Sequence, residues 1–170
     1  NLAEKLMVRI GVYPASLDPI HFGHINIAVR SSQIFDEVVV AIYDNPKKHI
    51  LFTPDERVEL AEKCFEGYNN IKVVKYSGLT VNFVRSIGAV ALIRGLRVFG
   101  DFEYEFRMGM ANKKLAPEVE TVAILADEHY MHISSSTVRE IAELGGDVSK
   151  MVPSHVRDAL VARYSELKSN

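Results

Sequence analysis

The segment Ala15-Ser16-Leu17-Asp18-Pro19-Ile20-His21-Phe22-Gly23-His24 decides how the rest of the chain is interpreted. It follows an apolar run, Val8–Tyr13, that predicts a buried strand, and it precedes a run with helical spacing, Ile25–Phe35. Two histidines therefore lie where a first strand leads into a first helix. In an open α/β sheet, ligands bind at this place, beyond the carboxyl ends of the strands. The free N–H groups and the positive dipole at a helix start favour an anion such as phosphate.

Taken alone, the pattern His21-Phe22-Gly23-His24 is short enough to occur by chance. Histidines at this spacing are also compatible with a metal site, and two histidines in the core or on the surface are the simplest alternative. Gly23 favours a ligand, because a glycine lets a bulky group approach the backbone closely. The position after the first strand and the cations farther along the chain together favour a phosphate or nucleotide.

Length and composition are those of an ordinary globular domain. The 170 residues are enough for one domain with a sizeable core, and a content of 48% hydrophobic and 25% charged residues is typical. The net charge of −2 gives no basic surface, so we expect no nucleic-acid partner. The single cysteine, Cys64, excludes a disulfide framework, and we interpret it as a helix-face residue with no base nearby.

The sequence carries no signal for a membrane. No apolar run reaches the roughly 20 residues that a spanning helix needs, and residues 1–6 lack the apolar region of a signal peptide. Met7 is a candidate natural start, which would leave residues 1–6 as an added or disordered end. We therefore expect a single domain over residues 1–170, located in the cytoplasm.

Strands and helices alternate along the whole chain. Val38–Tyr43 is continuously apolar and rich in β-branched residues, which is typical of a strand buried on both faces of a parallel sheet. Thr53-Pro54-Asp55-Glu56 is a helix start with a capping box and a proline in the first turn. The other expected strands are 8–13, 71–76, 90–93 and 121–125, and the expected helices are 22–34, 53–66, 80–87, 99–115, 134–145 and 153–167. This order predicts an α/β fold with a doubly wound five-stranded parallel sheet and a C-terminal helix.

Polar side chains follow each predicted strand, so they converge on one rim of the sheet. Arg94 and Arg97 flank a glycine after the fourth strand, and this position favours a function over a solvated surface pair. Guanidinium groups match phosphate oxygens in geometry. Lys47 and His49 follow the second strand, and for them a solvated surface is favoured over a function. The rim as a whole has the cations and hydroxyls that a site for several phosphates requires.

Three successive serines, Ser134–Ser136, follow the fifth strand. Serine is a good helix cap, and Thr137–Glu140 itself fits a capping box, so capping is a competing explanation. Three serines exceed what one cap needs, and their hydroxyl and N–H groups at a helix start could hold a triphosphate. Asp18 is interpreted as a brace for the turn at Pro19.

Several other signatures are missing from the sequence. There is no G-x-G-x-x-G after the first strand and no G-x-x-x-x-G-K-[ST], which argues against a dinucleotide dehydrogenase and a P-loop NTPase. There is also no nucleophile elbow with a Ser/His/Asp pattern. What remains is direct transfer on phosphorus, in which positioning and charge stabilisation do nearly all of the work.

The pattern H-F-G-H at 21–24, together with I-S-S-S-T-V-R at 133–139, resembles the paired signature of the HxGH nucleotidyltransferase superfamily. Within it, the chain closely resembles the bacterial phosphopantetheine adenylyltransferases over about residues 8–160. DFEYE following RGLR makes the combination far more specific than any one segment. The matching segments are YPASLDPIHFGH (13–24), the loop Pro46-Lys47-Lys48, FTPDERVEL (52–60), LIRGLR (92–97), DFEYE (101–105) and ISSSTVRE (133–140).

The resemblance implies a Rossmann-like nucleotidyltransferase fold. It also implies that the 4′-phosphate of phosphopantetheine attacks the α-phosphorus of ATP, giving dephospho-coenzyme A and pyrophosphate without a covalent intermediate. His24 and Lys48 would stabilise the transition state, and a magnesium ion is expected on the phosphates, with no ligand set from protein side chains alone. The implied substrate-binding residues are Ser16, Lys48, Thr80 and Arg94, and the implied ATP-binding residues are Ser16, Leu17, His24, Gly95, Leu96, Arg97, Glu105, Tyr130, Met131, His132, Ile133, Ser134, Ser135 and Ser136.

The chain departs from the family pattern at a few positions. Ser16 and Leu17 stand where the family often has threonine and phenylalanine, and a hydroxyl is kept at Ser16. His21 and Phe22 replace a commoner polar pair, which makes the motif similar to that of nicotinamide mononucleotide adenylyltransferases. Thr80 stands where an apolar residue is more usual.

Two other functions stay open at this point. The first is an enzyme like nicotinamide mononucleotide adenylyltransferase, against which the LIRGLR and DFEYE segments argue. The second is a non-catalytic nucleotide-binding regulatory domain, which would not need both His24 and Lys48. An aminoacyl-tRNA synthetase would need more domains and a basic surface, and a glycerol-phosphate cytidylyltransferase would show an Arg-Thr-Glu-Gly signature.

The resemblance further implies a homohexamer and coenzyme A as a feedback ligand.

Overall fold

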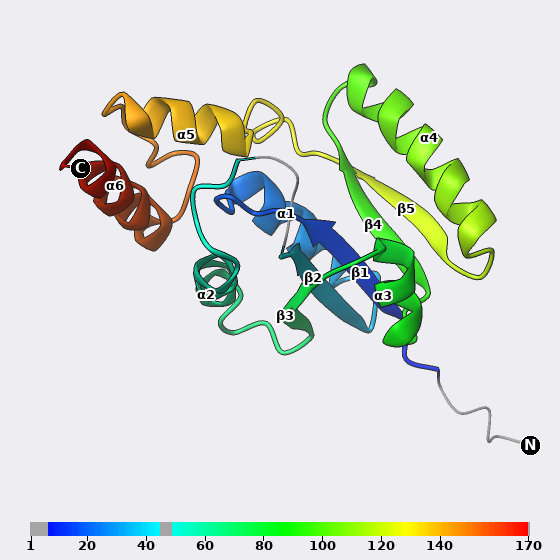
Figure 1. The fold of residues 1–170 in the computed structure, drawn as a ribbon. Helices are drawn as coiled ribbons and strands as arrows, with labels where there is room; N and C mark the ends of the chain where they lie inside the picture. The colour runs from blue at the N-terminus through cyan, green and yellow to red at the C-terminus, as the bar shows by residue number, and fades with distance from the viewer. Residues whose placement is uncertain (1–6, 45–48, 170) are drawn as a thin grey trace, which may run out of the picture.

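A parallel β-sheet forms the centre of the protein (Figure 1). The computed structural model describes residues 7–44 and 49–169. Five strands lie in the order β3-β2-β1-β4-β5, and all neighbouring strands are parallel, so the predicted doubly wound sheet is confirmed. The strands are β1 (Ile10–Ala15), β2 (Glu37–Tyr43), β3 (Ile71–Tyr76), β4 (Ala91–Leu96) and β5 (Glu120–Leu125).

Helices cover both faces of the sheet. They are α1 (Phe22–Ser31), α2 (Pro54–Cys64), α3 (Thr80–Ser86), α4 (Phe99–Leu115), α5 (Ser135–Glu143) and α6 (Ser154–Ser169). α1, α2, α5 and α6 share one apolar cluster, to which they contribute Ile27, Leu60, Val138 and Leu160, whereas α3 packs on the other face through Val81. α4 lies beside β4 and β5, at the far end of the sheet from α5 and α6 (Figure 1). Within the described ranges, none of the helices is both long enough and apolar enough to cross a membrane.

The side chains of β2 show why its sequence is continuously apolar. Val38, Val40 and Ile42 belong to the cluster under α1 and α2, while Val39 and Ala41 belong to the cluster under α3. Successive side chains of a strand point to opposite faces, so a strand covered on both faces needs an apolar residue at every position.

The strand order reverses between β1 and β4. In the described chain these two strands pair at Gly11 and Val12 of β1 alone. Farther along, Pro14 has no N–H to donate, and its carbonyl accepts a hydrogen bond from Nη1 of Arg94 at 3.0 Å. The two strands therefore separate toward their carboxyl ends, at the switch point where open α/β sheets bind ligands.

β4 is longer than the sequence predicts. The predicted end was Ile93, with Arg94–Arg97 beyond the strand, but β4 continues to Leu96 because its pairing with β5 continues that far. The prediction was wrong because a charged residue and a glycine are typical of a loop, yet both can lie in a strand at the rim of a sheet. The other boundaries agree within a few residues, and the predicted capping box of Thr53 and Glu56 is present.

The turn after β1 is tied to a distant part of the chain. Leu17 has a φ of 51°, which is unusual for a bulky residue, and its side chain is only 2% exposed. The carboxylate of Asp18 accepts hydrogen bonds from the N–H groups of Leu51 at 2.7 Å and Phe52 at 2.9 Å. Asp18 therefore does more than brace the turn at Pro19, because it holds that turn against the segment that precedes α2.

Candidate active site

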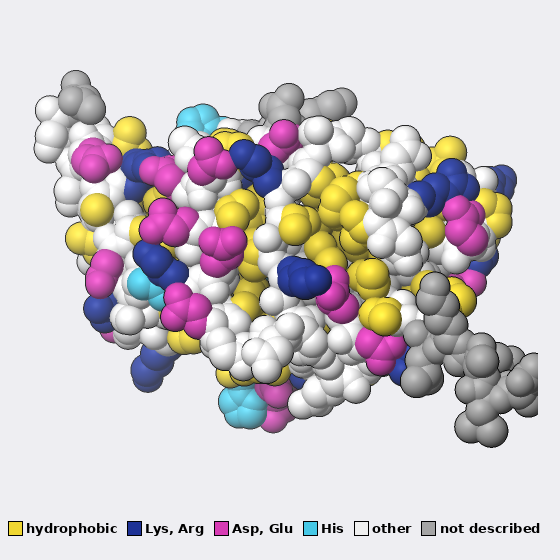
Figure 2. Space-filling view, turned by 90° about the horizontal axis from the view of Figure 1, so that it is seen from below, with side chains coloured by type: hydrophobic (Ala, Val, Ile, Leu, Met, Phe, Trp, Pro, Cys, Tyr) yellow, Lys and Arg dark blue, Asp and Glu magenta, His cyan; other side chains and the backbone are white. Residues whose placement is uncertain are grey.

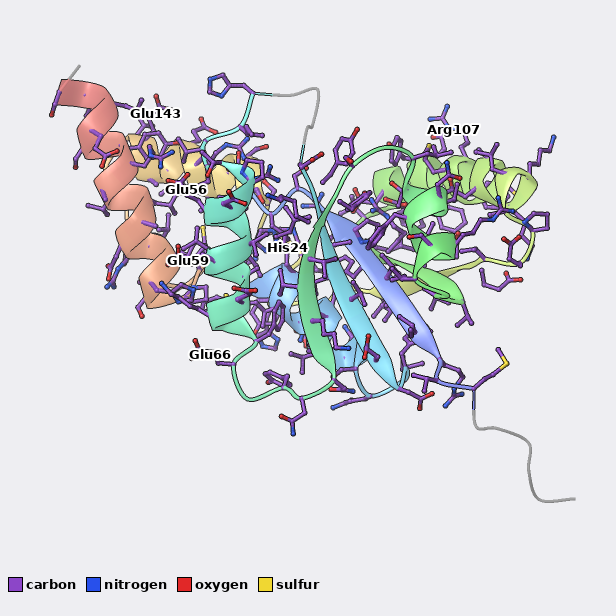
Figure 3. The ribbon with its side chains drawn as sticks, turned by 60° about the horizontal axis from the view of Figure 1, so that its bottom comes forward. His24, Glu56, Glu59, Glu66, Arg107 and Glu143 are labelled. Atoms are coloured by element: carbon purple, nitrogen blue, oxygen red, sulfur yellow. The ribbon has the colours of Figure 1, made fainter. Side chains whose placement is uncertain are left out.

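A cavity of about 750 Å³ opens at the carboxyl rim of the sheet, where β1 and β4 separate. This volume is in the range of sites for small molecules and cofactors. Figure 3 shows His24 at the start of α1, beside the central strands. The predicted site residues that line the cavity are Ser16, His24, Thr80, Arg94, Gly95, Arg97, Glu105, Tyr130, Ser134, Ser135 and Ser136.

His21 and His24 form the start of α1 together. Nδ1 of His21 accepts a hydrogen bond from the N–H of Gly23 at 3.0 Å, and the backbone N–H of His21 donates to Nδ1 of His24 at 3.2 Å. The two rings stack with their centroids 3.7 Å apart, and a Cβ at Gly23 would come within 2.8 Å of the His21 ring. Because Nδ1 of His24 accepts a bond, the hydrogen-bond network assigns the proton of the neutral ring to Nε2.

Burial fixes the charge state of the His21 ring. Burial, with a smaller contribution from the Arg97 guanidinium, lowers the pKa of His21 to about 3. His21 is therefore neutral at physiological pH and serves as a helix cap. His24, in contrast, lines the cavity.

Replacing His21 by asparagine should flatten the acid side of the stability curve. Between pH 3 and 6.5 the unfolded chain binds a proton at His21 that the folded chain does not. The free energy of unfolding therefore falls as the pH decreases over this range, by at most about 1.4 kcal/mol per pH unit for this group. Asparagine keeps a capping side chain without a titrating ring. Urea unfolding of both proteins at several pH values tests this, and equal pH slopes would contradict a neutral His21.

Arg94 is held in place by a partly buried carboxylate. Its Nε and Nη2 each donate to a carboxylate oxygen of Glu105 at 2.8 Å, while Nη1 donates to the carbonyl of Pro14 at 3.0 Å. The Glu105 side chain is 13% exposed and the Arg94 side chain 33% exposed. A guanidinium has five N–H donors, so one on Nη1 and one on Nη2 stay available for a ligand in the cavity. Guanidinium N–H groups of this kind suit the oxygens of a phosphate.

Arg97 joins the start of α4 to the segment that precedes α5. Its backbone N–H and Nε donate to Oδ2 of Asp101 at 3.0 and 3.2 Å, and its Nη1 donates to the carbonyl of Ile133 at 3.1 Å. The Arg97 side chain is 40% exposed and lines the cavity. It therefore adds a second fixed positive charge to the same wall as Arg94.

The three serines combine capping with a place in the cavity wall. Ser134 is the N-cap of α5, and its Oγ accepts a hydrogen bond from the N–H of Thr137 at 3.1 Å. The helix therefore does not begin with the capping box that the sequence suggests at Thr137. Oγ of Ser135 donates to the carbonyl of Pro19 at 2.9 Å, which fastens α5 to the turn after β1. The first N–H groups of a helix have no partner inside it, so this end of the cavity suits an anion.

Some predicted site residues lie elsewhere. The side chains of Leu17 and Ile133 are buried in the core, so a contact from either with a ligand has to come from its backbone. Lys47 and Lys48 lie outside the described residues, and the role of Lys48 stays a prediction, whereas His49 is exposed. The predicted ATP-binding residues that do not line the cavity are Leu17, Leu96, Met131, His132 and Ile133.

An aromatic wall of the cavity was missed in the sequence. The rings of Tyr43 and Tyr76 lie 5.4 Å apart, and Tyr76 stacks on Phe83 at 4.9 Å. The Tyr76 hydroxyl lies 3.0 Å from Oγ1 of Thr80, which fixes this threonine in the same wall. Tyr13 also lines the cavity, and burial raises its pKa to about 12, so it stays neutral. A tyrosine near the carboxyl end of an apolar strand is the signal that could have found these residues.

Among the described residues, the cavity lacks the ligands of a dedicated metal site. No group of three or more histidines, cysteines or carboxylates that could hold a metal ion occurs within residues 7–44 and 49–169. The acidic residues of the cavity, Asp101 and Glu105, are both paired with arginines. Mg²⁺ is commonly held through substrate phosphates and water. The residues present therefore fit an ion that arrives on phosphates.

Cys64 has a neighbour that the sequence did not reveal. Nε2 of His155 in α6 lies 3.6 Å from its Sγ, so the expectation that no base lies nearby was wrong. The two residues are 91 positions apart, and only the packing of α6 on α2 joins them. Burial nevertheless raises the pKa of the Cys64 thiol to about 12, which leaves it protonated and unreactive.

The fold and the site together define an α/β protein with a cavity at the switch point of its sheet, lined by arginines and the starts of two helices. The chain matches the cytidylyltransferase-like family over residues 12–141. It is 50% identical to the phosphopantetheine adenylyltransferase of Roseiflexus castenholzii over 157 residues, which cover 92% of this chain and 98% of that protein. It is 46% identical to the protein of that name from Alkaliphilus metalliredigens over 153 residues, and 47% identical to that from Heliobacterium modesticaldum over 159 residues. These two matches cover 90% and 94% of this chain and 98% and 95% of the relatives.

The chain belongs to the phosphopantetheine adenylyltransferase family, within the cytidylyltransferase-like proteins.

Proposed function

We propose that the protein transfers the adenylyl group of ATP to 4′-phosphopantetheine. An oxygen of the 4′-phosphate forms a bond with the α-phosphorus of ATP, and the bond between this phosphorus and the bridging oxygen to the β-phosphate breaks. Dephospho-coenzyme A and pyrophosphate leave, and no covalent intermediate with the protein forms. The observation that carries the proposal is that His24, two anchored arginines and two helix starts line one cavity at the switch point.

The geometry supports distinct tasks for these groups. A donor on Nε2 of His24 suits the charge that develops on the α-phosphate as the new bond forms. Arg94, with N–H donors left over from Glu105 and Pro14, suits the 4′-phosphate, and the start of α5 suits the triphosphate. Magnesium on the phosphates would supply neutralisation of charge, and it needs no protein carboxylate beyond those already paired.

The remaining parts of the proposal concern ligands and location. Coenzyme A contains both halves of the product, so the same cavity is the natural place for it to bind as a feedback ligand. The aromatic wall of Tyr43 and Tyr76, with Thr80 beside it, is suited to the pantetheine arm, because a long flexible arm is held best by apolar surface. We place the enzyme in the cytoplasm, where its substrate ATP is available.

Labelled ATP tests which group is transferred. With ATP labelled at the α-phosphorus, we expect the label in dephospho-coenzyme A, and with ATP labelled at the γ-phosphorus we expect it in pyrophosphate. Mass spectrometry of the products measures this. Label from the γ-phosphate in the organic product would indicate a kinase and contradict the proposal, as would the absence of product.

We also propose that the enzyme assembles as a homohexamer. α4 has no buried residue in the single chain, and Phe99, Phe102, Phe106 and Met110 are 96%, 55%, 57% and 56% exposed. Figure 2 shows hydrophobic side chains gathered on the half of the molecule that carries α3 and α4. Apolar areas of this kind mark protein interfaces, so further copies of the chain are suitable occupants.

Light scattering should give a molar mass about six times the 19.1 kDa of the chain. Phe106→Glu should lower this mass, because it places a charge in the apolar face of α4. Leu167→Glu on α6, at a position exposed to a similar degree, serves as the matched control and should leave the mass unchanged. A monomeric native protein would refute the assembly without affecting the proposed reaction.

A further inference from the structure

Arg57 in α2 is a charged residue buried beside the site. Its side chain is 0% exposed, and it does not line the cavity. Its Nη1 donates to the carbonyls of Ser16 at 2.7 Å and Tyr43 at 3.0 Å, and its Nε donates to the carbonyl of Phe52 at 3.2 Å. One guanidinium thus joins the turn after β1, the end of β2 and the segment before α2.

Stability alone does not explain an arginine at this position. Burial lowers the pKa of Arg57, and the negative charges of Asp18 and Asp44 oppose that effect. Nη2 of Arg57 and Oδ1 of Asp44 are both buried without a hydrogen bond among the described residues. A folded protein with buried ions of this kind is often no more stable than the same protein with well-packed apolar side chains in their place. The arginine is therefore better explained by the geometry that its three hydrogen bonds impose.

The backbone that Arg57 holds is strained. Leu17 follows Ser16 with a φ of 51°, and a bulky residue keeps such a conformation only when its surroundings enforce it. Arg57 fixes the carbonyl on one side of Leu17, and the carboxylate of Asp18, bound to the N–H of Phe52, fixes the other side. The strained turn is thus clamped from both ends against the start of α2.

We propose that Arg57 is a positioning residue for the adenylyl transfer, which acts through the Ser16 carbonyl to place the Ser16 hydroxyl in the cavity. Ser16 lines the cavity, whereas Arg57 lies behind it and touches no substrate. The inference rests on the proposed function, because it assigns to Arg57 a part in that reaction. Small displacements of a positioned group cost rate, since the reacting atoms then meet less often in the productive geometry.

A double-mutant cycle between Arg57 and Ser16 tests the inference. Arg57→Lys keeps the charge but loses the planar fork, and we expect kcat to fall roughly 10- to 100-fold with little change in either KM. In a Ser16→Ala background the same change should cost less than about threefold, because the hydroxyl that Arg57 positions is already absent. Arg57→Met, which keeps the length of the stem without the charge, repeats the cycle if the lysine variant does not fold.

Leu60→Ala, one turn farther along α2, is the matched control. It removes a core side chain that is 8% exposed and lies outside the cavity, so it should lower the free energy of unfolding but leave kcat per folded molecule unchanged. If the fold-losses in kcat of the two single variants multiply to give the loss in the double variant, Arg57 does not act through Ser16. A wild-type kcat for Arg57→Lys would also overturn the positioning role. An inactive wild-type protein would instead refute the proposed function, so the two failures are distinguishable.

Discussion

The His24→Ala variant is expected to lose roughly 10²–10³ in kcat, about 3–4 kcal/mol of transition-state stabilisation, while it stays folded. The reason is the geometry at the start of α1. The His21 backbone N–H donates to Nδ1 of His24, so the proton of the neutral His24 ring is on Nε2, and this ring lines the cavity. Both KM values should change little, because the interaction strengthens only as charge develops on the α-phosphate.

Steady-state pyrophosphate release measures this loss, and circular dichroism checks that the variant is folded. His129→Ala is a matched control, because His129 is also a histidine but is exposed, bonded to Asp127 and outside the cavity. It should retain wild-type kcat. A folded His24→Ala variant with wild-type kcat would remove His24 from the mechanism.

The second large effect is expected for Arg94→Ala, which should raise the KM for 4′-phosphopantetheine by about 10- to 100-fold and change the KM for ATP much less. A charge-assisted hydrogen bond contributes roughly 1.5–3 kcal/mol, and Arg94 has N–H donors left over for the phosphate. The substitution also leaves the partly buried carboxylate of Glu105 without its partner. Arg94→Lys should rescue only part of the affinity, because lysine lacks the fork.

Arg85→Ala is the matched control for this variant. Arg85 also pairs with a glutamate, Glu118, but the pair is exposed and lies outside the cavity. Both KM values should stay at the wild-type level in this control. If Arg94→Ala leaves the apparent affinity for phosphopantetheine unaltered, Arg94 does not bind the 4′-phosphate.

The sequence predicts the fold well because its signals are local. The continuous apolar run of β2 and the capping box at Thr53 depend on residues within a few positions of one another, and both are present. The end of β4 was misplaced because the residues that extend it, Arg94 to Leu96, are unlike a strand by composition and pair only because β5 lies beside them.

The site could be predicted in outline for a physical reason. The carboxyl ends of parallel strands meet at one rim, so residues that follow different strands had to converge. The sequence could not show how those residues are held, because the contacts join distant positions. Ser135 bonds to Pro19 from 116 residues away, and Arg57 bonds to Ser16 from 41 residues away. No local pattern distinguishes Arg57 from an exposed arginine of an amphipathic helix.

The most direct measurement is pyrophosphate release from ATP with two acceptors, 4′-phosphopantetheine and nicotinamide mononucleotide, under identical conditions. The proposed function predicts release with phosphopantetheine and none above background with the mononucleotide. Pantetheine without its phosphate should also be inactive, because the attacking oxygen belongs to that phosphate. Release with the mononucleotide alone would keep His24 but overturn the assignments of Arg94 and Thr80, and release with neither acceptor would contradict the proposed reaction.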